Sequence, residues 1–173
     1  MSRIDYDLSM IRGVVFDMDG VLSPSTVNVR EDGTLERHSN VKDGYAIQYA
    51  LRRGLHLAVI SGARDLTMEP AYKSLGIKDV YFHCGHKVAT LHSWMEKHGL
   101  APEEVAFIGD DIPDIKAMME VGLRVTPADG AVEVKGIATY ISPVKGGQGV
   151  ARDLISQILS AKGEWLLDDA YDW

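Results

Sequence analysis

The sequence contains a single cysteine, Cys84, which excludes an internal disulfide framework and fits a reducing compartment. It has no apolar run that approaches the ~20 residues of a membrane-spanning helix. Its first ten residues include charged side chains and lack the apolar core of a signal peptide. These absences predict a cytoplasmic protein with no membrane partner.

Basic side chains are also scarce, because 18 lysines and arginines face 25 aspartates and glutamates and leave a net charge of −7. A chain this acidic binds the phosphate backbone of nucleic acids poorly, and we expect no nucleic-acid partner. The tail at about 163–173 holds four acidic residues and no basic one, so that residues 1–163 carry 18 − 21 = −3. We expect this tail either to be disordered or to pack its aromatic rings on a neighbouring subunit.

Buried strands alternate with helices along the whole chain. Strands are expected at 14–16, 57–60, 80–82 and 105–108, with shorter candidates at 124–125 and 139–141. Helices are expected at 43–53, from 67 or 69 to 75, at 87–98, after 108 and at 150–160. Segments 27–29 and 34–36 flank a glycine turn and predict a β-hairpin. The alternation predicts one α/β domain, residues 1–173, with a parallel sheet flanked by helices.

Polar residues follow each of the four main predicted strands. Asp17 comes after the first strand, Ser61 after the second, the segment 84–87 after the third, and Asp110 with Asp111 after the fourth. Parallel strands place their carboxyl ends at one edge of the sheet, where ligands bind. We therefore expect these side chains to converge on one site.

Two acidic clusters are part of this set. Asp17-Met18-Asp19-Gly20 is compatible with a simple Asx turn, and Asp110-Asp111 with Asp114 is compatible with acids at a helix N-terminus. Together, however, these carboxylates repel one another unless a cation lies among them. All-oxygen ligands at an open site suit Mg²⁺.

Three further positions supply what a phosphate needs at such a site. Ser61 offers a hydroxyl and Gly62 a backbone N–H, while Lys87 opens a helix, where a lysine is unfavourable against the dipole. Lys87 is therefore either a solvated surface residue or one with an ionic partner. Mg²⁺, a lysine, a hydroxyl and a carboxylate nucleophile are the requirements for phosphoryl transfer to an aspartate.

These segments, in this order, resemble the haloacid dehalogenase superfamily of phosphatases. The four matching motifs, in order, are residues 16–21, residues 60–62, Lys87 and residues 108–114. The resemblance implies a Rossmann-like sheet, with Asp17 as the nucleophile and Asp19 as the general acid/base. It also implies that Ser61 and Lys87 bind the phosphate. The implied ligands of Mg²⁺ are Asp17, Asp110 and the backbone carbonyl of Asp19, with Asp114 as a supporting residue.

The interval from Asp19 to Ser61 has room for the hairpin, at about 25–38, and one helix, but not for the cap domain of most superfamily members. The segments 40–45 and 146–152 resemble the cap-less branch of 3-deoxy-D-manno-octulosonate 8-phosphate (KDO 8-phosphate) phosphatases. That resemblance implies hydrolysis of this sugar phosphate in lipopolysaccharide precursor synthesis, and a homotetramer. The implied substrate-binding residues are Asp19, Asn40, Lys42, Asp43, Gly44, Gly62, Arg64 and Lys87.

The sequence departs from that branch at two basic positions, which leaves a related nine-carbon acid sugar phosphate as an alternative substrate. The branch often has arginine directly after the glycine of the second motif, whereas here Ala63 intervenes before Arg64. The branch often has a second basic residue in the helix that follows, and in this sequence that position is occupied by Ala71.

Other classes of function fit less well. A phosphorylatable receiver domain has its lysine last, whereas Lys87 precedes Asp110, and a catalytically dead binding domain would not retain the four motifs. His83, Cys84 and His86 lack partners at the spacing of a transition-metal site. The run from Gly146 to Gly149 is not followed by the G-K-[ST] of a nucleotide-binding loop, and it either connects flexibly to the last helix or lines the substrate.

Overall fold

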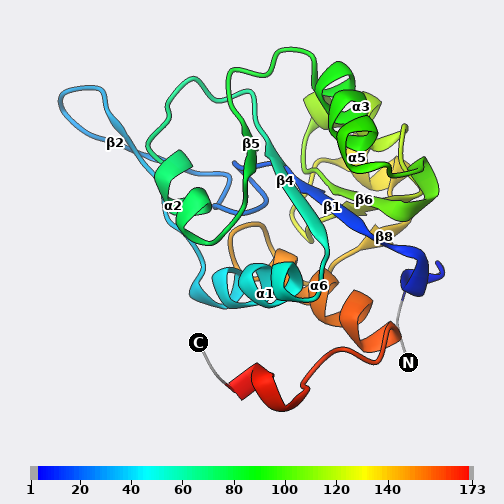
Figure 1. Cartoon of the computed structure of the whole chain (residues 1–173). Coiled ribbons are helices and arrows are strands. Elements are labelled where there is room, and N and C mark those ends of the chain that lie inside the picture. Colours follow the sequence, from blue (N-terminus) through cyan, green and yellow to red (C-terminus); the bar gives the residue numbers. More distant parts are fainter. Residues whose placement is uncertain (1–3, 172–173) are drawn as a thin grey trace.

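The computed structural model describes residues 4–171. Its centre is a six-stranded sheet in the order β5-β4-β1-β6-β7-β8 (Figure 1). Every neighbouring pair is parallel. The strands are β1 (Gly13–Phe16), β4 (His56–Ile60), β5 (Asp79–Tyr81), β6 (Val105–Ile108), β7 (Leu123–Thr126) and β8 (Tyr140–Ile141). The predicted parallel α/β architecture is confirmed.

The central strands are buried on both faces, as their continuous apolar sequences predict. Every residue of β1 and of β6 is buried. β1 lies between β4 and β6, and its last residue, Phe16, is in register with Val59 on one side and Ile108 on the other. The chain therefore leaves these three strands at the same edge of the sheet.

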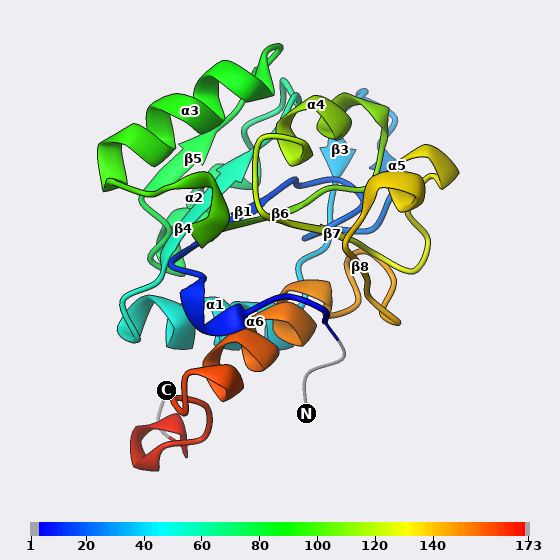
Figure 2. The same ribbon diagram turned by 90° about the vertical axis from the view of Figure 1, so that its right-hand side faces the viewer.

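Helices cover both faces of the sheet (Figure 2). α1 (Val41–Arg52) and α6 (Val150–Ala161) lie on one face, with the short 3₁₀ helix η1 (Leu8–Met10) beside α6. α3 (Lys87–His98), α4 (Ile115–Met118) and α5 (Val132–Ile137) lie on the other. The apolar positions of α6 at helical spacing are all buried in the first layer, and the fully buried Trp94 of α3 packs in the second.

Three short 3₁₀ helices, η2 (Pro102–Glu104), η3 (Ile112–Asp114) and η4 (Asp168–Tyr171), and the helix α2 (Glu69–Ser74) complete the fold. The sequence analysis missed α5, a six-residue helix that contains a glycine and therefore has a weak helical signal. In the described part of the chain, no helix is both long and apolar enough to cross a membrane.

The predicted hairpin is present and projects away from the sheet (Figure 1). β2 (Asn28–Val29) pairs antiparallel with β3 (Leu35–Glu36) around a turn in which Gly33 has a φ of +82°. Neither strand is buried, and Val29 is 68% exposed. Between β1 and β4, the described chain contains only this hairpin and α1 as regular elements, so no cap domain is inserted there.

The acidic tail packs on its own chain, an arrangement that the sequence analysis did not consider. Trp165 meets the rings of Tyr45 and Tyr49 edge-on, and the guanidinium of Arg152 lies 4.9 Å from the centre of its ring. Arg53 forms an ion pair with Asp169. Asp172 and Trp173 lie outside the described residues.

Asp43 joins the two helices of the first layer. α6 follows Gly149, which has no side chain to cap the helix, so its first amides need acceptors from elsewhere. Oδ1 of Asp43, from the first turn of α1, accepts a hydrogen bond from the backbone N of Arg152 at 2.7 Å. The carboxylate also complements the positive end of the α6 dipole.

We expect Asp43→Ala to lower the free energy of unfolding by about 1–2 kcal/mol, the usual cost of losing a helix cap. Asp43→Asn should cost less, because its amide oxygen still accepts the hydrogen bond. Thermal unfolding checks this, with Lys78→Ala, a substitution of an exposed residue outside the helices, as the control that leaves Tm unchanged. An alanine variant as stable as the wild type would contradict the capping role.

Candidate active site

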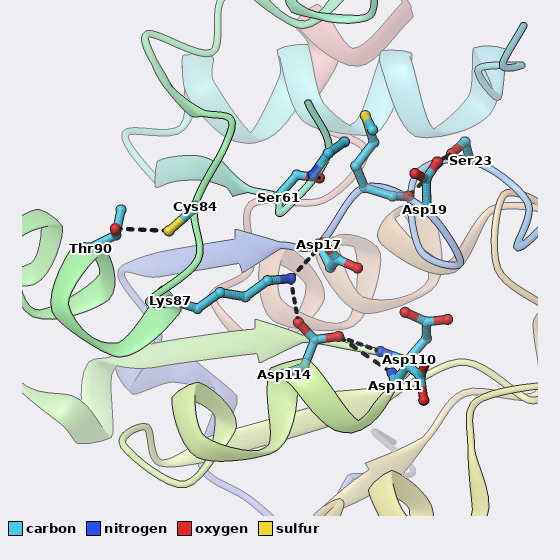
Figure 3. Close-up of polar contacts among 12 residues, drawn as sticks. Asp17, Asp19, Ser23, Ser61, Cys84, Lys87, Thr90, Asp110, Asp111 and Asp114 are labelled. Carbon is cyan, nitrogen blue, oxygen red and sulfur yellow. Dashed lines mark hydrogen bonds and ion pairs between the residues drawn. The ribbon is translucent and has the colours of Figure 1, made fainter. Parts of the chain in front are cut away.

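A cleft of about 310 Å³ lies at the carboxyl edge of the sheet. It brings together five predicted residues from four separate loops: Asp17, Asp19, Ser61, Lys87 and Asp110 (Figure 3). The remaining lining residues are Ser25, Gly62, Ala63, Asp111, Pro113 and Asp114. The predicted convergence at one sheet edge is therefore present in the structure.

Backbone hydrogen bonds extend the sheet to two of these residues, Asp17 and Ser61. The N–H of Asp17 donates to the carbonyl of Ile108 at 3.0 Å, and that of Ser61 donates to the carbonyl of Tyr81 at 2.9 Å. Asp17 and Ser61 are only 8% and 3% exposed. Each side chain is consequently held by a rigid strand end at the bottom of the cleft.

Lys87 has the ionic partners that its position at the start of α3 suggested. Its Nζ lies 2.8 Å from Oδ1 of Asp17 and 2.6 Å from Oδ1 of Asp114 (Figure 3). Burial disfavours the ammonium, but the two carboxylates outweigh it and raise the pKa of Lys87 above its ordinary value. Lys87 is therefore a buried, charged residue whose position is set by two aspartates.

Asp114 connects this lysine to the fourth motif. Its other oxygen, Oδ2, accepts hydrogen bonds from the backbone N–H groups of Asp110 and Asp111, at 3.0 and 3.4 Å. The side chain is 1% exposed. Because both oxygens are engaged, Asp114 orients Lys87 and the turn after β6 together.

The cluster holds more negative charge than one lysine balances. Burial, then the charge of Asp114, raises the pKa of Asp17 to about 6, although Lys87 opposes the shift. Burial, then the charges of Asp17 and Asp114, raises the pKa of Asp110 to about 8. Carboxylate oxygens of these three aspartates lie within 4.8 Å of one another. An all-oxygen, acidic group of this kind fits a hard divalent cation such as Mg²⁺.

Gly20 is required for this close packing. Its φ is +85°, and a Cβ at this position would overlap the carboxylate of Asp110. The glycine loop near the last helix packs on the same turn: a Cβ at Gly146 would meet the carbonyl of Gly20, and the N–H of Gly147 donates to the carbonyl of Val21 at 2.8 Å. The loop therefore supports the first motif.

The carboxylate of Asp19 turns toward the hairpin instead of the acidic cluster. It accepts two hydrogen bonds from Arg37, at 2.8 Å from Nε and 3.0 Å from Nη2, and one from the hydroxyl of Ser23 at 3.0 Å. Sequence analysis did not identify Arg37. The only available signal was a basic residue directly after the hairpin, and nothing local places it beside Asp19.

The other predicted substrate-binding residues do not line the cleft, apart from Gly62. Arg64 and Lys42 are exposed. Asn40 caps α1 by accepting from the N–H of Lys42 at 2.9 Å, and Gly44 is buried against Leu75. Asn40 and Gly44 instead line a second pocket of about 220 Å³, together with Ser39, Val41, Ala71, Tyr72, Ser74 and Leu75.

No second metal-type cluster appears among residues 4–171. The three aspartates of the cleft are the only group of histidine, cysteine and acidic side chains there with suitable spacing. The Sγ atom of Cys84 lies 2.9 Å from the hydroxyl oxygen of Thr90.

The fold and this cleft define the chain as a haloacid dehalogenase-like hydrolase. The sequence profile of that family matches residues 23–122, more than half of the chain. The chain therefore belongs to the haloacid dehalogenase-like hydrolases.

Its relatives include enzymes of one particular kind. The chain is 35% identical over 160 residues to the 3-deoxy-D-manno-octulosonate 8-phosphate phosphatase KdsC of Escherichia coli K12, covering 92% of this chain and 84% of that one. The Yersinia pestis phosphatase of the same name superposes with a TM-score of 0.88 at 32% identity, covering 91% of this chain and 85% of that one. The Moraxella catarrhalis phosphatase, solved with magnesium, phosphate and KDO, superposes with a TM-score of 0.85 at 30% identity, covering 90% and 89%.

The raised pKa values predict how pH and Mg²⁺ affect stability. The folded, metal-free protein holds the protons of Asp17 and Asp110 more tightly than the unfolded chain, whose aspartates have pKa values near 3.8. The two bound protons therefore stabilise the folded protein. This contribution is complete at a pH below the pKa of the unfolded aspartates and is lost as the pH rises toward 8. We expect the metal-free Tm to fall from pH 5 to pH 8. Mg²⁺, which replaces these protons, should raise Tm more at pH 8.

Asp110→Asn separates this effect from other titrations. Without metal at pH 8, the variant should have a Tm several degrees above that of the wild type, because about 1 kcal/mol moves the Tm of such a chain by about 2–4 °C. It should also lose the increase in Tm caused by Mg²⁺. Calorimetry at the two pH values measures both, and a metal-free variant less stable than the wild type at pH 8 would contradict this account.

Proposed function

We propose that this protein is a Mg²⁺-dependent phosphatase that hydrolyses KDO 8-phosphate to KDO and inorganic phosphate in the cytoplasm, during lipopolysaccharide precursor synthesis. The observation that carries the proposal is the buried contact of Asp17 with Lys87 at the bottom of an acidic cleft. Relatives named for this activity, which match along most of the chain, support the substrate.

Asp17 is the proposed nucleophile. One of its oxygens attacks phosphorus, the bond from phosphorus to the sugar oxygen breaks, and an aspartyl phosphate forms. Asp19 donates a proton to the departing sugar oxygen. Water then attacks phosphorus, Asp19 takes a proton from that water, and the bond to Asp17 breaks to release inorganic phosphate and the free carboxylate.

The surrounding residues hold charge and orient the phosphate. Lys87 neutralises Asp17 and the phosphoryl group, while the hydroxyl of Ser61 and the N–H of Gly62 donate to phosphate oxygens. The Oγ of Ser61 accepts from the N–H of Ala63 at 3.1 Å, which orients the hydroxyl and leaves its proton available for the phosphate. Asp17, Asp110 and the backbone carbonyl of Asp19 would hold Mg²⁺, which supplies positive charge to the reacting phosphate when bound.

A second substrate, a nine-carbon acid sugar phosphate of the sialic type, is favoured by one observation. The branch of KDO 8-phosphate phosphatases often carries two basic positions, and here Arg64 is exposed outside the cleft while Ala71 lines the second pocket. The carboxylate of the sugar therefore has a different environment in this chain.

Phosphate release in the presence of Mg²⁺ tests the function. We expect KDO 8-phosphate to be hydrolysed with a higher kcat/KM than a nine-carbon acid sugar 9-phosphate or a hexose phosphate. Asp17→Asn should lower kcat by at least ~10³-fold, because an amide cannot form the acyl phosphate. The variant should keep a Tm equal to or above the wild type, since it removes a buried charge. Equal turnover of all three substrates would refute the specificity, and an active Asp17→Asn variant would refute the nucleophile.

We also propose that the protein is a homotetramer in which hairpins pair between subunits. The hairpin buries no face within its own chain, and an isolated two-stranded hairpin is marginal in water. A closed ring of identical subunits would cover these strands and roof each cleft.

Deletion of residues 28–36, which removes the hairpin but keeps Arg37, tests this assembly. We expect light scattering to give the mass of a tetramer for the full chain and a smaller species for the deletion. Activity toward the sugar phosphate should fall with the mass. A fully active monomer at the concentration of the assay would refute the proposal.

A further inference from the structure

Arg37 is a buried arginine at the base of the hairpin, next to the cleft. It directly follows β3, and only 4% of its side chain is exposed. Its guanidinium meets two carboxylates: Nε and Nη2 bind Asp19, at 2.8 and 3.0 Å, and Nη1 lies 2.7 Å from Oδ2 of Asp65. A bidentate contact of this kind fixes orientation as well as distance.

The second carboxylate holds the arginine in place from another loop. Asp65 lies in the segment after β4, where its Oδ1 accepts from the N–H of Thr67 at 2.9 Å and its Oδ2 from the Thr67 hydroxyl at 3.1 Å. Arg37 therefore bridges the loop that contains Asp19 and the loop that begins with Ser61. Both of these loops line the cleft.

The carboxylate of Asp19 is in turn held on both oxygens. Oδ1 accepts from Arg37 and from the hydroxyl of Ser23, and Oδ2 accepts from Arg37. Even so, 36% of the Asp19 side chain stays exposed, and the residue lines the cleft. This combination of a fixed carboxylate and an open edge is what proton transfer to a bound substrate needs.

We propose that Arg37 is a positioning residue that aims Asp19 at the leaving oxygen of the substrate. The inference rests on the proposed role of Asp19 as the proton donor. Arg37 does not bind the substrate, because three of its nitrogens already bind carboxylates and almost none of its surface is exposed. It also makes the hairpin part of the catalytic apparatus within one chain, since the strand that closes the hairpin delivers this side chain.

The leaving group separates positioning of a proton donor from a general structural effect. A sugar phosphate releases a poor leaving group that needs a proton, whereas p-nitrophenyl phosphate releases a phenolate that departs without one. Proton donation contributes about 10²–10⁴-fold to rate. We expect Arg37→Ala to lower kcat/KM, which reports the steps up to departure of the leaving group and not the later attack of water, by ~10²-fold for a sugar phosphate and by less than about 5-fold for p-nitrophenyl phosphate.

Three companion variants sharpen the comparison. Asp19→Asn should show the same dependence on leaving group, and Asp65→Ala a weaker form of it, because it loosens the arginine without removing it. Arg12→Ala is the matched control: this arginine also pairs with a carboxylate, that of Glu104 at 3.0 Å, but its side chain is 48% exposed and it lines neither the cleft nor the hairpin. Its kinetics should match the wild type. Added guanidinium ion should partly restore the turnover of sugar phosphate by Arg37→Ala.

Each other result overturns the inference. Equal losses of kcat/KM by Arg37→Ala on both substrates would assign the arginine to folding, and a raised KM with kcat unchanged would assign it to substrate binding. If Asp19→Asn kept its turnover of sugar phosphate, the proposed role of Asp19 would fail and the inference with it. If the loss caused by Asp19→Asn depended on the leaving group and the loss caused by Arg37→Ala did not, the proposed role of Asp19 would stand and the inference about Arg37 would fail. The comparison needs any sugar phosphate that the wild type hydrolyses, so it does not depend on KDO 8-phosphate.

Discussion

The buried contact between Lys87 and two aspartates is the interaction on which the rest of the site depends. An ammonium that is removed from water is stable only if carboxylates surround it at hydrogen-bonding distance, and Asp17 and Asp114 do so at 2.8 and 2.6 Å. Asp17 directly follows β1, Asp114 ends the 3₁₀ helix η3 after β6, and Lys87 begins α3. These ion pairs therefore connect the edge of the sheet to the helix layer. With Asp110, the cluster still carries more negative charge than Lys87 neutralises, which suits a divalent cation.

Close packing of backbone around the first motif provides the necessary rigidity. Gly20 allows the turn after β1 to approach Asp110, and Gly146 allows a loop more than a hundred residues later to press on the same turn. Because neither approach tolerates a Cβ, the turn after Asp17 is held between Asp110 and the loop that contains Gly146. Rigid positioning of this kind is what an in-line displacement at phosphorus requires.

The hairpin contributes to the site through its two ends, whereas the strands of the sheet contribute the residues that follow them. Its tip is exposed, yet both of its ends return to the cleft: Ser25 lines it before β2, and Arg37 reaches Asp19 and Asp65 after β3. One short insertion thus has an exposed tip and, at its base, a buried arginine that binds the carboxylate of Asp19.

The sequence by itself determined the sheet, most helices and the core of the site. Continuous apolar runs identify β1 and β6, and parallel topology requires that Asp17, Ser61, Lys87 and Asp110 meet at one edge. These conclusions follow from local pattern and from the geometry of parallel strands, which hold for any sequence of this kind.

Only the tertiary structure decided which side chains turn into the cleft and which support it. Asp43 lies in the segment 40–45 that predicted substrate binding, yet it caps α6 because α1 and α6 pack against each other. Trp165 packs on α1 because the tail folds back, and Arg37 meets Asp19 because the hairpin returns at that point. Each of these contacts joins residues that are far apart in the chain or separated by an insertion, and no periodicity or spacing in the sequence encodes such a distance.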